Sequence, residues 1–396
     1  MASSGAASKE EDVPGDIVHE DLVLAVTCHP SQNLIASGCI DGSVTIHSFS
    51  ASEKIKLLRT LPHHKKSCRA LRFSPGGKRL YTAGKDKSLW CIDTETGGIR
   101  RKIKAAHESA IYSLLVTGER FVATGDDDGV LKLWDMRSKS ATMELKECEE
   151  FISDMIIDQQ QKILVATSGE GTLTAFNIRR KRMDLQSELF DSELLSLAAV
   201  KGEQRVVCGS GDGTLNIFHW GQWGNISDRF PGHPMSIDCI VPITEDIVCT
   251  GSMDGMIRAV NILPNRFLGI VGEHEDFPIE GLALSHDKQY LASCSHDQRV
   301  KFWFVGDVKK EKINVSKKAK HSNQTKRLGT AAKKMGTVDV DTSKLVFTGV
   351  TGTDRVNSRL SPVKFDNVLA NPSNLYNNAD GKIKIPVNGV YYITLG

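Results

Sequence analysis

The sequence lacks the long apolar runs that would carry a chain into or across a membrane. Of its 396 residues, 40% are hydrophobic and 25% are charged, yet no apolar stretch approaches the roughly 20 residues that a membrane-spanning helix needs. The N-terminal stretch MASSGAASKEEDVPG has no apolar core of the kind found in secretory signals. We therefore expect no membrane contact, and a disordered tail over residues 1–14.

Motifs that would carry catalysis or hold a cofactor are also missing. The nine cysteines include no CxxC pair and mostly lie in apolar strand patterns, which favours reduced, buried thiols over a metal site or a disulfide framework. There is no GxSxG stretch, and the glycine-rich residues 209–213 are typical of a turn rather than of a phosphate-binding loop. Aromatic residues make up 6% of the chain and form no base-stacking array. We expect no enzyme activity, no metal and no cofactor.

What the sequence does contain is an internal repeat. The stretch GDDDGVLKLWDMR (125–137) places turn acids and glycine before an alternating strand. Equivalent turn acids recur at intervals of 42 to 45 residues, at Asp41, Asp86, Asp128, Glu170, Asp212, Asp254 and Asp297. The apolar runs and turn residues of each unit predict several short strands. Residues 17–306 contain no amphipathic stretch of helical period.

This repeat resembles the WD-repeat family, whose units are four-stranded blades of a β-propeller. The resemblance implies an all-β fold with a seven-bladed propeller over residues 15–306, because one unit cannot bury both faces of its sheet and seven stacked units can. Closing the ring requires a strand from one terminus, and residues 15–18 and 311–316 are the candidates. The likeness of DIVHE near the N-terminus to IVGEH before the last repeat favours residues 15–18.

Family members often pin each blade with a buried hydrogen-bond network, since a buried carboxylate must be compensated. The network joins a loop His, a Ser or Thr, the turn Asp and a Trp. When the family pattern is applied to this sequence, two blades have every member of the network. They are His107, Thr124, Asp128 and Trp134 in blade three, and His274, Ser293, Asp297 and Trp303 in blade seven. Blades two and six lack only the Trp, with His64, Thr82 and Asp86 and with His233, Thr250 and Asp254, whereas blades four and five have lost the His and the hydroxyl. We therefore expect Asp128→Ala to cost more stability than Glu170→Ala.

Longer stretches resemble one branch of that family, the WD repeat-containing protein 55 family. Residues 227–266 carry most of this likeness, because IRAVNILPNR is not generic repeat consensus. The resemblance implies a non-catalytic scaffold of the nucleus and nucleolus, with some cytoplasmic presence. It implies support of ribosomal RNA synthesis or processing and of ribosome biogenesis, by a monomer within larger complexes that bind ribosome-assembly factors.

A second resemblance concerns Trp134, Asp135 and Arg137. They match the WDxR motif of propellers that dock onto the cullin-4 ubiquitin ligase through its damage-specific DNA-binding adaptor. In such propellers the arginine projects from the blade edge to the partner, a role that suits the guanidinium group. The implied alternative function is a substrate receptor of that ligase. The competing interpretation is an arginine with only a local salt bridge.

Residues 307–336 form a strongly basic segment. Between 309 and 334 there are ten Lys and Arg and one acid, a net charge of +9 against +2 for the whole chain, which leaves −7 for the remainder. Its low apolar content predicts a disordered linker. The candidates for a nuclear or nucleolar address, or for contact with RNA phosphates, are Lys317, Lys318, Lys320, Lys326, Arg327, Lys333 and Lys334. A solubilising linker is the alternative.

Strand patterns return in residues 337–396. The stretches PVKFDNVL and PVNGVYY, with Asp-Gly and Asn-Gly turns between strands, resemble the first half of a complement-C1q-type jelly roll. Half of a β-sandwich leaves open strand edges and an uncovered apolar face. We therefore expect a truncated β segment that reflects a gene-model or splice fusion, or a relic, rather than a working domain.

Overall fold

The computed structural model describes residues 13–310, 376–377 and 382–383. The chain divides into two compact units, Met1–Asn314 and Val315–Gly396. In the second unit the described residues form one antiparallel pair, β29 (Tyr376–Asn377) with β30 (Lys382–Ile383). Residues 1–12 of the expected N-terminal tail, the basic segment beyond Lys310 and the rest of the C1q-like stretch lie outside the described residues.

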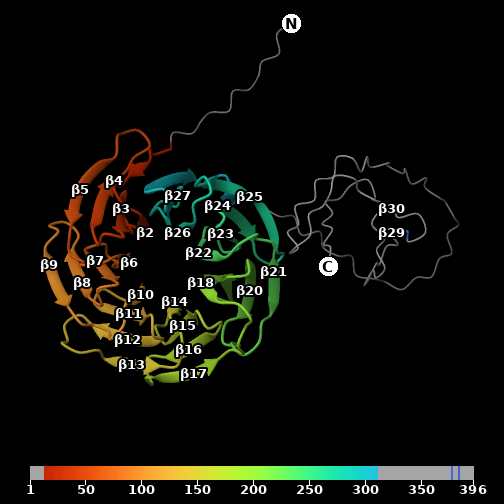
Figure 1. Cartoon of the computed structure of the whole chain (residues 1–396), viewed down its shortest axis with the longest axis horizontal. Helices are drawn as coiled ribbons and strands as arrows, with labels where there is room; N and C mark the ends of the chain where they lie inside the picture. Colours follow the sequence, from red (N-terminus) through yellow and green to blue (C-terminus); the bar gives the residue numbers. More distant parts are fainter. Residues whose placement is uncertain (1–12, 311–375, 378–381, 384–396) are drawn as a thin grey trace, which may run out of the picture. The chain divides into compact units, whose positions relative to one another are not determined.

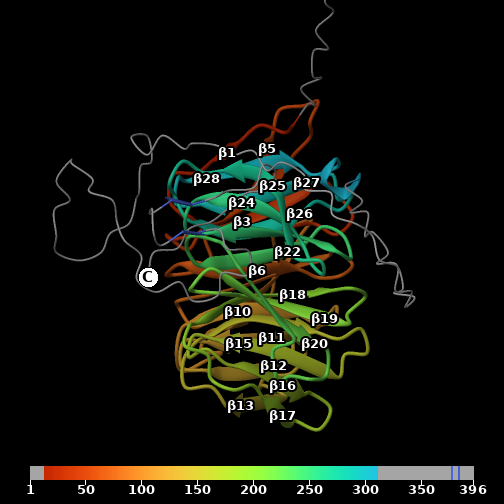
Figure 2. The same ribbon diagram turned by 90° about the vertical axis from the view of Figure 1, so that its right-hand side faces the viewer.

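The first unit consists of seven four-stranded antiparallel sheets arranged around a central axis (Figure 1). The same sheets are seen turned by 90° in Figure 2. In each sheet the innermost strand faces the axis and the outermost strand lies at the rim. The all-β, seven-bladed propeller expected from the repeat is confirmed.

Blades one to six each use four consecutive strands. The strands of blades one and two are β2 (Val23–Cys28), β3 (Leu34–Cys39), β4 (Val44–Ser48), β5 (Lys56–Leu61), β6 (Cys68–Phe73), β7 (Arg79–Gly84), β8 (Leu89–Asp93) and β9 (Ile99–Ile103). Those of blades three and four are β10 (Ile111–Val116), β11 (Phe121–Asp126), β12 (Val130–Asp135), β13 (Met143–Lys146), β14 (Ile152–Ile157), β15 (Ile163–Ser168), β16 (Leu173–Asn177) and β17 (Arg182–Gln186). Those of blades five and six are β18 (Leu194–Val200), β19 (Arg205–Ser210), β20 (Thr214–His219), β21 (Asp228–Pro231), β22 (Ile237–Pro242), β23 (Ile247–Ser252), β24 (Met256–Asn261) and β25 (Arg266–Glu273).

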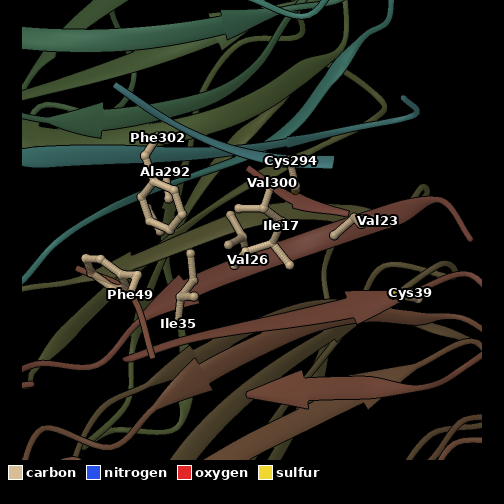
Figure 3. Close-up of a cluster of buried hydrophobic side chains, with 11 residues drawn as sticks. Ile17, Val23, Val26, Ile35, Cys39, Phe49, Ala292, Cys294, Val300 and Phe302 are labelled. Atoms are coloured by element: carbon tan, nitrogen blue, oxygen red, sulfur yellow. The ribbon is translucent and has the colours of Figure 1, made fainter. Parts of the chain in front are cut away.

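Blade seven joins the two ends of the ring. It contains β26 (Ile279–Leu284), β27 (Tyr290–Ser295), β28 (Arg299–Phe304) and β1 (Ile17–Val18). β1 pairs with β28, placing Ile17 opposite Val300. Figure 3 shows Ile17 among the buried side chains of blades seven and one, including Val300 and Val26. The N-terminal candidate is therefore the strand that closes the ring. A single 3-10 turn, η1 (Val308–Lys310), follows β28.

Burial decreases from the middle of each blade to its rim. In the second strands β7, β15, β19 and β27, every residue after the first is buried. Each of these strands packs between two neighbouring blades, so its two faces both require apolar or small side chains. The rim strand β5, by contrast, exposes five of its six residues. This gradient explains why the apolar runs ending in small residues mark the second strand of each repeat.

Each of the seven blades also has a register shift near the start of its first strand, such as that between Ile111 and Ser113. In two blades the serine just after the shift bonds to the next blade. The Ser113 hydroxyl donates to the carbonyl oxygen of Ile152 over 2.7 Å, and that of Ser196 donates to Ile237 over 2.8 Å. A bulge redirects a side chain, and here it turns the serine towards the neighbouring sheet. Such bonds hold adjacent blades in a fixed orientation.

No helix in the part of the chain that the structure describes is long and apolar enough to cross a membrane.

Blade networks and candidate interaction surfaces

Blade three contains a chain of four buried polar side chains. Trp134 donates from Nε1 to Thr124 Oγ1 over 2.8 Å, and Thr124 Oγ1 lies 2.6 Å from His107 Nε2. His107 Nδ1 lies 2.8 Å from the carboxylate of Asp126. Since a carboxylate only accepts, His107 donates from Nδ1 and accepts the Thr124 hydroxyl at Nε2. The chain fixes the loop before β10 against β11 and β12.

The acid in this network is Asp126, so the expected role of Asp128 is wrong. Asp126 ends β11 at 1% exposure and also accepts the backbone N–H of Val130. Asp128 is exposed, and its own backbone N–H donates to Asp126. Burial alone would raise the pKa of Asp126, but the bonds from His107 and Val130 outweigh it and lower that pKa. Three consecutive aspartates made spacing alone a poor guide to which one turns inwards.

Blade seven brings together all four residues named for it. His274 Nδ1 lies 2.7 Å from Asp297, and His274 Nε2 lies 2.7 Å from the hydroxyl of Ser293. Trp303 donates from Nε1 to the same hydroxyl over 2.7 Å. Burial lowers the pKa of His274, so the imidazole is neutral at pH 7 and serves as a fixed hydrogen-bond relay.

Blade two recruits a tryptophan that the spacing of the repeat did not indicate. His64 bonds to Asp86 over 3.0 Å and to Thr82 over 2.9 Å, as expected. Trp90 donates to Ser88 over 2.7 Å, and Ser88 donates to Asp86 over 2.7 Å. Burial works against ionisation of Asp86, but these bonds from His64 and Ser88 still hold its pKa below the usual range.

Blade six departs from the expected network. His233 bonds to Thr250 over 2.9 Å, but its Nδ1 is buried without a partner. Asp254 instead accepts two bonds from the guanidinium group of Arg258, over 3.0 and 2.6 Å. The expected pairing of His233 with Asp254 is wrong, because a forked guanidinium on β24 takes both carboxylate oxygens. Burial, helped by the charge of Arg258, lowers the pKa of His233 to about 4.

The remaining blades replace the network in different ways. In blade one, His19 lies 3.2 Å from Ser37, and His47 occupies the Trp position with a buried Nδ1 that has no partner. In blades four and five the Trp position holds Phe176 and Phe218, which are 1% and 0% exposed. These phenylalanines fill the space by packing alone.

The WDxR stretch divides into a buried and an exposed half. Trp134 is 4% exposed and belongs to the blade-three network, so its side chain does not reach a partner. Arg137 has a side chain that is 60% exposed and pairs with Asp135, Nη2 to Oδ2, over 2.6 Å. This hydrogen bond lowers the pKa of Asp135 to about 2. The guanidinium carbon lies 5.9 Å from the ring centre of Phe121. We name Arg137, Asp135 and Phe121 the WDxR surface.

Phe121 was not foreseen from the sequence. It is 46% exposed and lies opposite Asp135 in the pairing of β11 with β12. Phe121 and Asp135 are 14 positions apart in the sequence, and the strand register places them side by side. Arg137 pairs with Asp135, so the register is what gives Arg137 an aromatic neighbour.

A cavity of about 870 Å³ opens at the axis, lined by the innermost strands. Lys66, Arg69 and Lys85 of blade two line it, together with Asp238 of blade six and Glu280 of blade seven. Burial, together with the nearby charge of Glu280, raises the pKa of Asp238 to about 6. Burial raises the pKa of Glu280 as well, and this side chain pairs with His296 over 2.8 Å.

The lining of the cavity includes a thiol, several hydroxyl groups and the imidazole of His296. Its thiol, Cys239, has a pKa raised well above the ordinary value by burial, so it stays protonated at pH 7. Across residues 13–310, no three His, Cys, Asp or Glu side chains gather as ligands for a metal ion. The lining carries charged side chains of both signs, including Arg69 and Glu280.

The basic residues named as a targeting signal, from Lys317 to Lys334, lie outside the described residues. Their role stays a prediction.

Comparison with known proteins follows the division of the chain. The WDR55 family model matches residues 14–308, and a C1q domain model matches residues 346–396. WD repeat-containing protein 55 of Mus musculus is 44% identical over 304 residues, 76% of this chain and 78% of that protein. The Homo sapiens protein of the same name is 44% identical over 308 residues, 78% of this chain and 80% of that protein. The homologue of Drosophila willistoni is 39% identical over 324 residues, 80% of this chain and 64% of that protein.

Proposed function

The chain belongs to the WD repeat-containing protein 55 family, and on that premise we propose that it is a non-catalytic scaffold of the nucleus and nucleolus. In this role it supports ribosomal RNA synthesis or processing by binding other proteins. The observation that carries the proposal is the family match over residues 14–308, which spans all seven blades.

The chemistry of the propeller supports binding rather than catalysis. The buried histidines, such as His107 and His274, are held by neighbouring hydroxyls and carboxylates and serve as structural relays. A general base has to reach a substrate, and these imidazoles are 2% and 0% exposed.

Depletion of the protein, followed by pulse labelling of newly made ribosomal RNA, tests the proposal. We expect labelled precursor or mature ribosomal RNA to fall, and the full chain to restore it. Unchanged labelling after depletion would remove ribosomal RNA production as the function.

We further propose that residues 309–334 direct the chain to the nucleolus. Their net charge of +9 supports this, since such runs bind import factors or RNA phosphates. Deleting 309–334 from a tagged chain should move it out of the nucleolus. An unchanged nucleolar signal would show that the address lies elsewhere.

An alternative function is a substrate receptor of a cullin-4 ubiquitin ligase, docked through the WDxR surface. The exposed guanidinium of Arg137, held in place by Asp135 beside Phe121, favours this candidate. Arg137→Ala should abolish co-purification with the ligase adaptor, whereas Lys139→Ala, which removes an exposed charge two residues away, should not. Equal recovery of the adaptor with both variants would remove the alternative.

A further inference from the structure

Positive charge is concentrated in one blade. Residues 62–110 contain twelve Lys and Arg and four Asp and Glu, a net charge of +8. The whole chain carries +2 and residues 309–334 carry +9, so all residues outside these two segments together carry −15. Blade two is therefore a basic sector in a propeller that is otherwise acidic.

Six lysines gather at one end of this blade, and we name them the blade-two lysine cluster. They are Lys65, Lys66, Lys85, Lys87, Lys102 and Lys104. Backbone bonds tie their three segments together: Lys85 N–H donates to Ser67 O, and Ala106 N–H donates to Lys87 O. The side chain of Lys87 also reaches the carbonyl oxygen of Glu108. The cluster thus combines the loop before β6, the β7–β8 turn and the end of β9.

These ammonium groups have no carboxylate partner among residues 13–310. Of the acids nearby, Asp86 accepts bonds from His64 and Ser88, and Asp127 pairs with Arg69 over 2.9 Å. Glu108 contacts Lys87 through its backbone carbonyl oxygen, and its side chain is exposed. The carboxylates at this end of the blade are mostly committed to other groups, so the cluster keeps its charge.

One lysine of the cluster is held in place by aromatic rings. Lys102 Nζ lies 3.4 Å from the ring centre of Trp90, and His63 stacks on the same indole with its centroid at 5.0 Å. A cation over an indole is favourably placed. Desolvation and then the charge of Lys104 lower the pKa of Lys102, and the charge of Asp86 offsets part of this effect.

The composition of the cluster favours a nucleic acid over an acidic protein segment. Stable protein interfaces are built around an apolar or aromatic centre and are poor in lysine. Within residues 62–110 the large apolar side chain that is exposed is Ile99, at the start of β9 and away from the cluster. Lysine-rich surfaces without an apolar centre are typical of contacts to phosphate groups.

We propose that the blade-two lysine cluster binds the phosphate backbone of RNA. The surface contacts the strand through charge, without reading its sequence. The acidic remainder of the propeller repels the same strand and so confines it to blade two. This inference rests on blade-two residues alone and stands apart from the proposed scaffold function.

The test compares two triple variants of the full chain, Lys65→Gln/Lys85→Gln/Lys104→Gln and Lys139→Gln/Lys162→Gln/Lys181→Gln. The lysines of the second set, from blades three and four, are also exposed and also form no ion pair within residues 13–310, so the net charge change is matched. Both variants keep residues 309–334, whose own contribution therefore cancels. Equal melting temperatures would show that both remain folded.

Binding of a labelled oligouridine of about 20 nucleotides is measured by fluorescence anisotropy between about 50 and 300 mM salt. Each lost phosphate contact on a single strand reduces the slope of log K against log salt by about 0.7. For the blade-two variant we expect the slope of log K against log salt to be smaller in magnitude by about 2, and the affinity at low salt to be about tenfold weaker. The control variant should stay close to wild type.

Two results would overturn the proposal. The first is equal slopes and affinities for the two variants, which would assign RNA binding to other residues. The second is a blade-two variant that loses binding to a labelled polyglutamate peptide and keeps its binding to RNA, which would identify an acidic protein as the partner.

Discussion

Asp126 and Asp128 lie two residues apart in one turn, yet only Asp126 is buried. Asp126→Ala would leave His107 Nδ1 and the backbone N–H of Val130 without their acceptor. We expect this change to lower the free energy of unfolding by about 1–3 kcal/mol, the cost of unsatisfied buried donors. Urea unfolding measures it.

Asp128→Ala is the matched control, because this side chain is exposed. We expect it to change stability by no more than about 0.5 kcal/mol. Equal losses for the two variants would contradict the assignment of Asp126 to the network.

His47 gives the propeller a stability that depends on pH. Burial, with a smaller contribution from His19, lowers its pKa to about 4, whereas an unfolded histidine titrates near 6.5. Between these values the unfolded state binds a proton that the folded state excludes, so stability falls as the pH drops from about 6.5 to 4. His47→Phe, which keeps a ring in the same place, should make this fall smaller by on the order of 1–2 kcal/mol.

Denaturant unfolding at several pH values checks this prediction. His286→Gln removes an exposed histidine and serves as the control. If His47→Phe retains the full acid sensitivity of the wild type, protonation of His47 does not contribute to that sensitivity.

At this scale the sequence predicted the histidine, hydroxyl and tryptophan of blades three and seven, because each occupies a fixed place in the repeat. It did not predict which carboxylate turns inwards. In blade three, Asp126 rather than Asp128 binds His107. In blade six, Asp254 binds Arg258 rather than His233. Both outcomes depend on side-chain geometry that spacing does not contain.

The strands are held in a ring by one short element, β1. It is two residues long, with Ile17 at 4% and Val18 at 69% exposure. Ile17→Ala removes apolar packing at the junction of blades seven and one, and we expect it to cost about 2–5 kcal/mol. Thermal or urea unfolding of the full chain measures this.

Val18→Ala alters the same strand on its solvent side and should cost no more than about 0.5 kcal/mol. An Ile17→Ala variant as stable as Val18→Ala would mean that β1 does not hold the ring together.

The strand pattern was readable from the sequence because second strands are buried on both faces and turns carry Asp and Gly. The bulge in each first strand was not. Ser113 and Ser196 look like ordinary strand residues, and only the register shift shows that they bond to the next blade. Contacts between repeats depend on how sheets stack, which a period in the sequence does not specify.

At the scale of the whole propeller, surfaces of different chemistry lie around one ring of seven blades. Blade two is basic, the axial cavity is lined by charged groups of both signs, and the WDxR surface exposes Arg137 beside Phe121. Rigid display of separate surfaces suits a protein that joins several partners. The central claim of this account is that the propeller works by binding.

The native mass of the tagged chain in a nuclear extract, measured at endogenous expression, tests that claim most directly. The chain alone has a mass of 43.4 kDa. We predict that most of it runs in complexes well above this mass, together with stoichiometric ribosome-assembly factors. Recovery of the bulk of the protein at 43.4 kDa, without stoichiometric partners, would contradict the account.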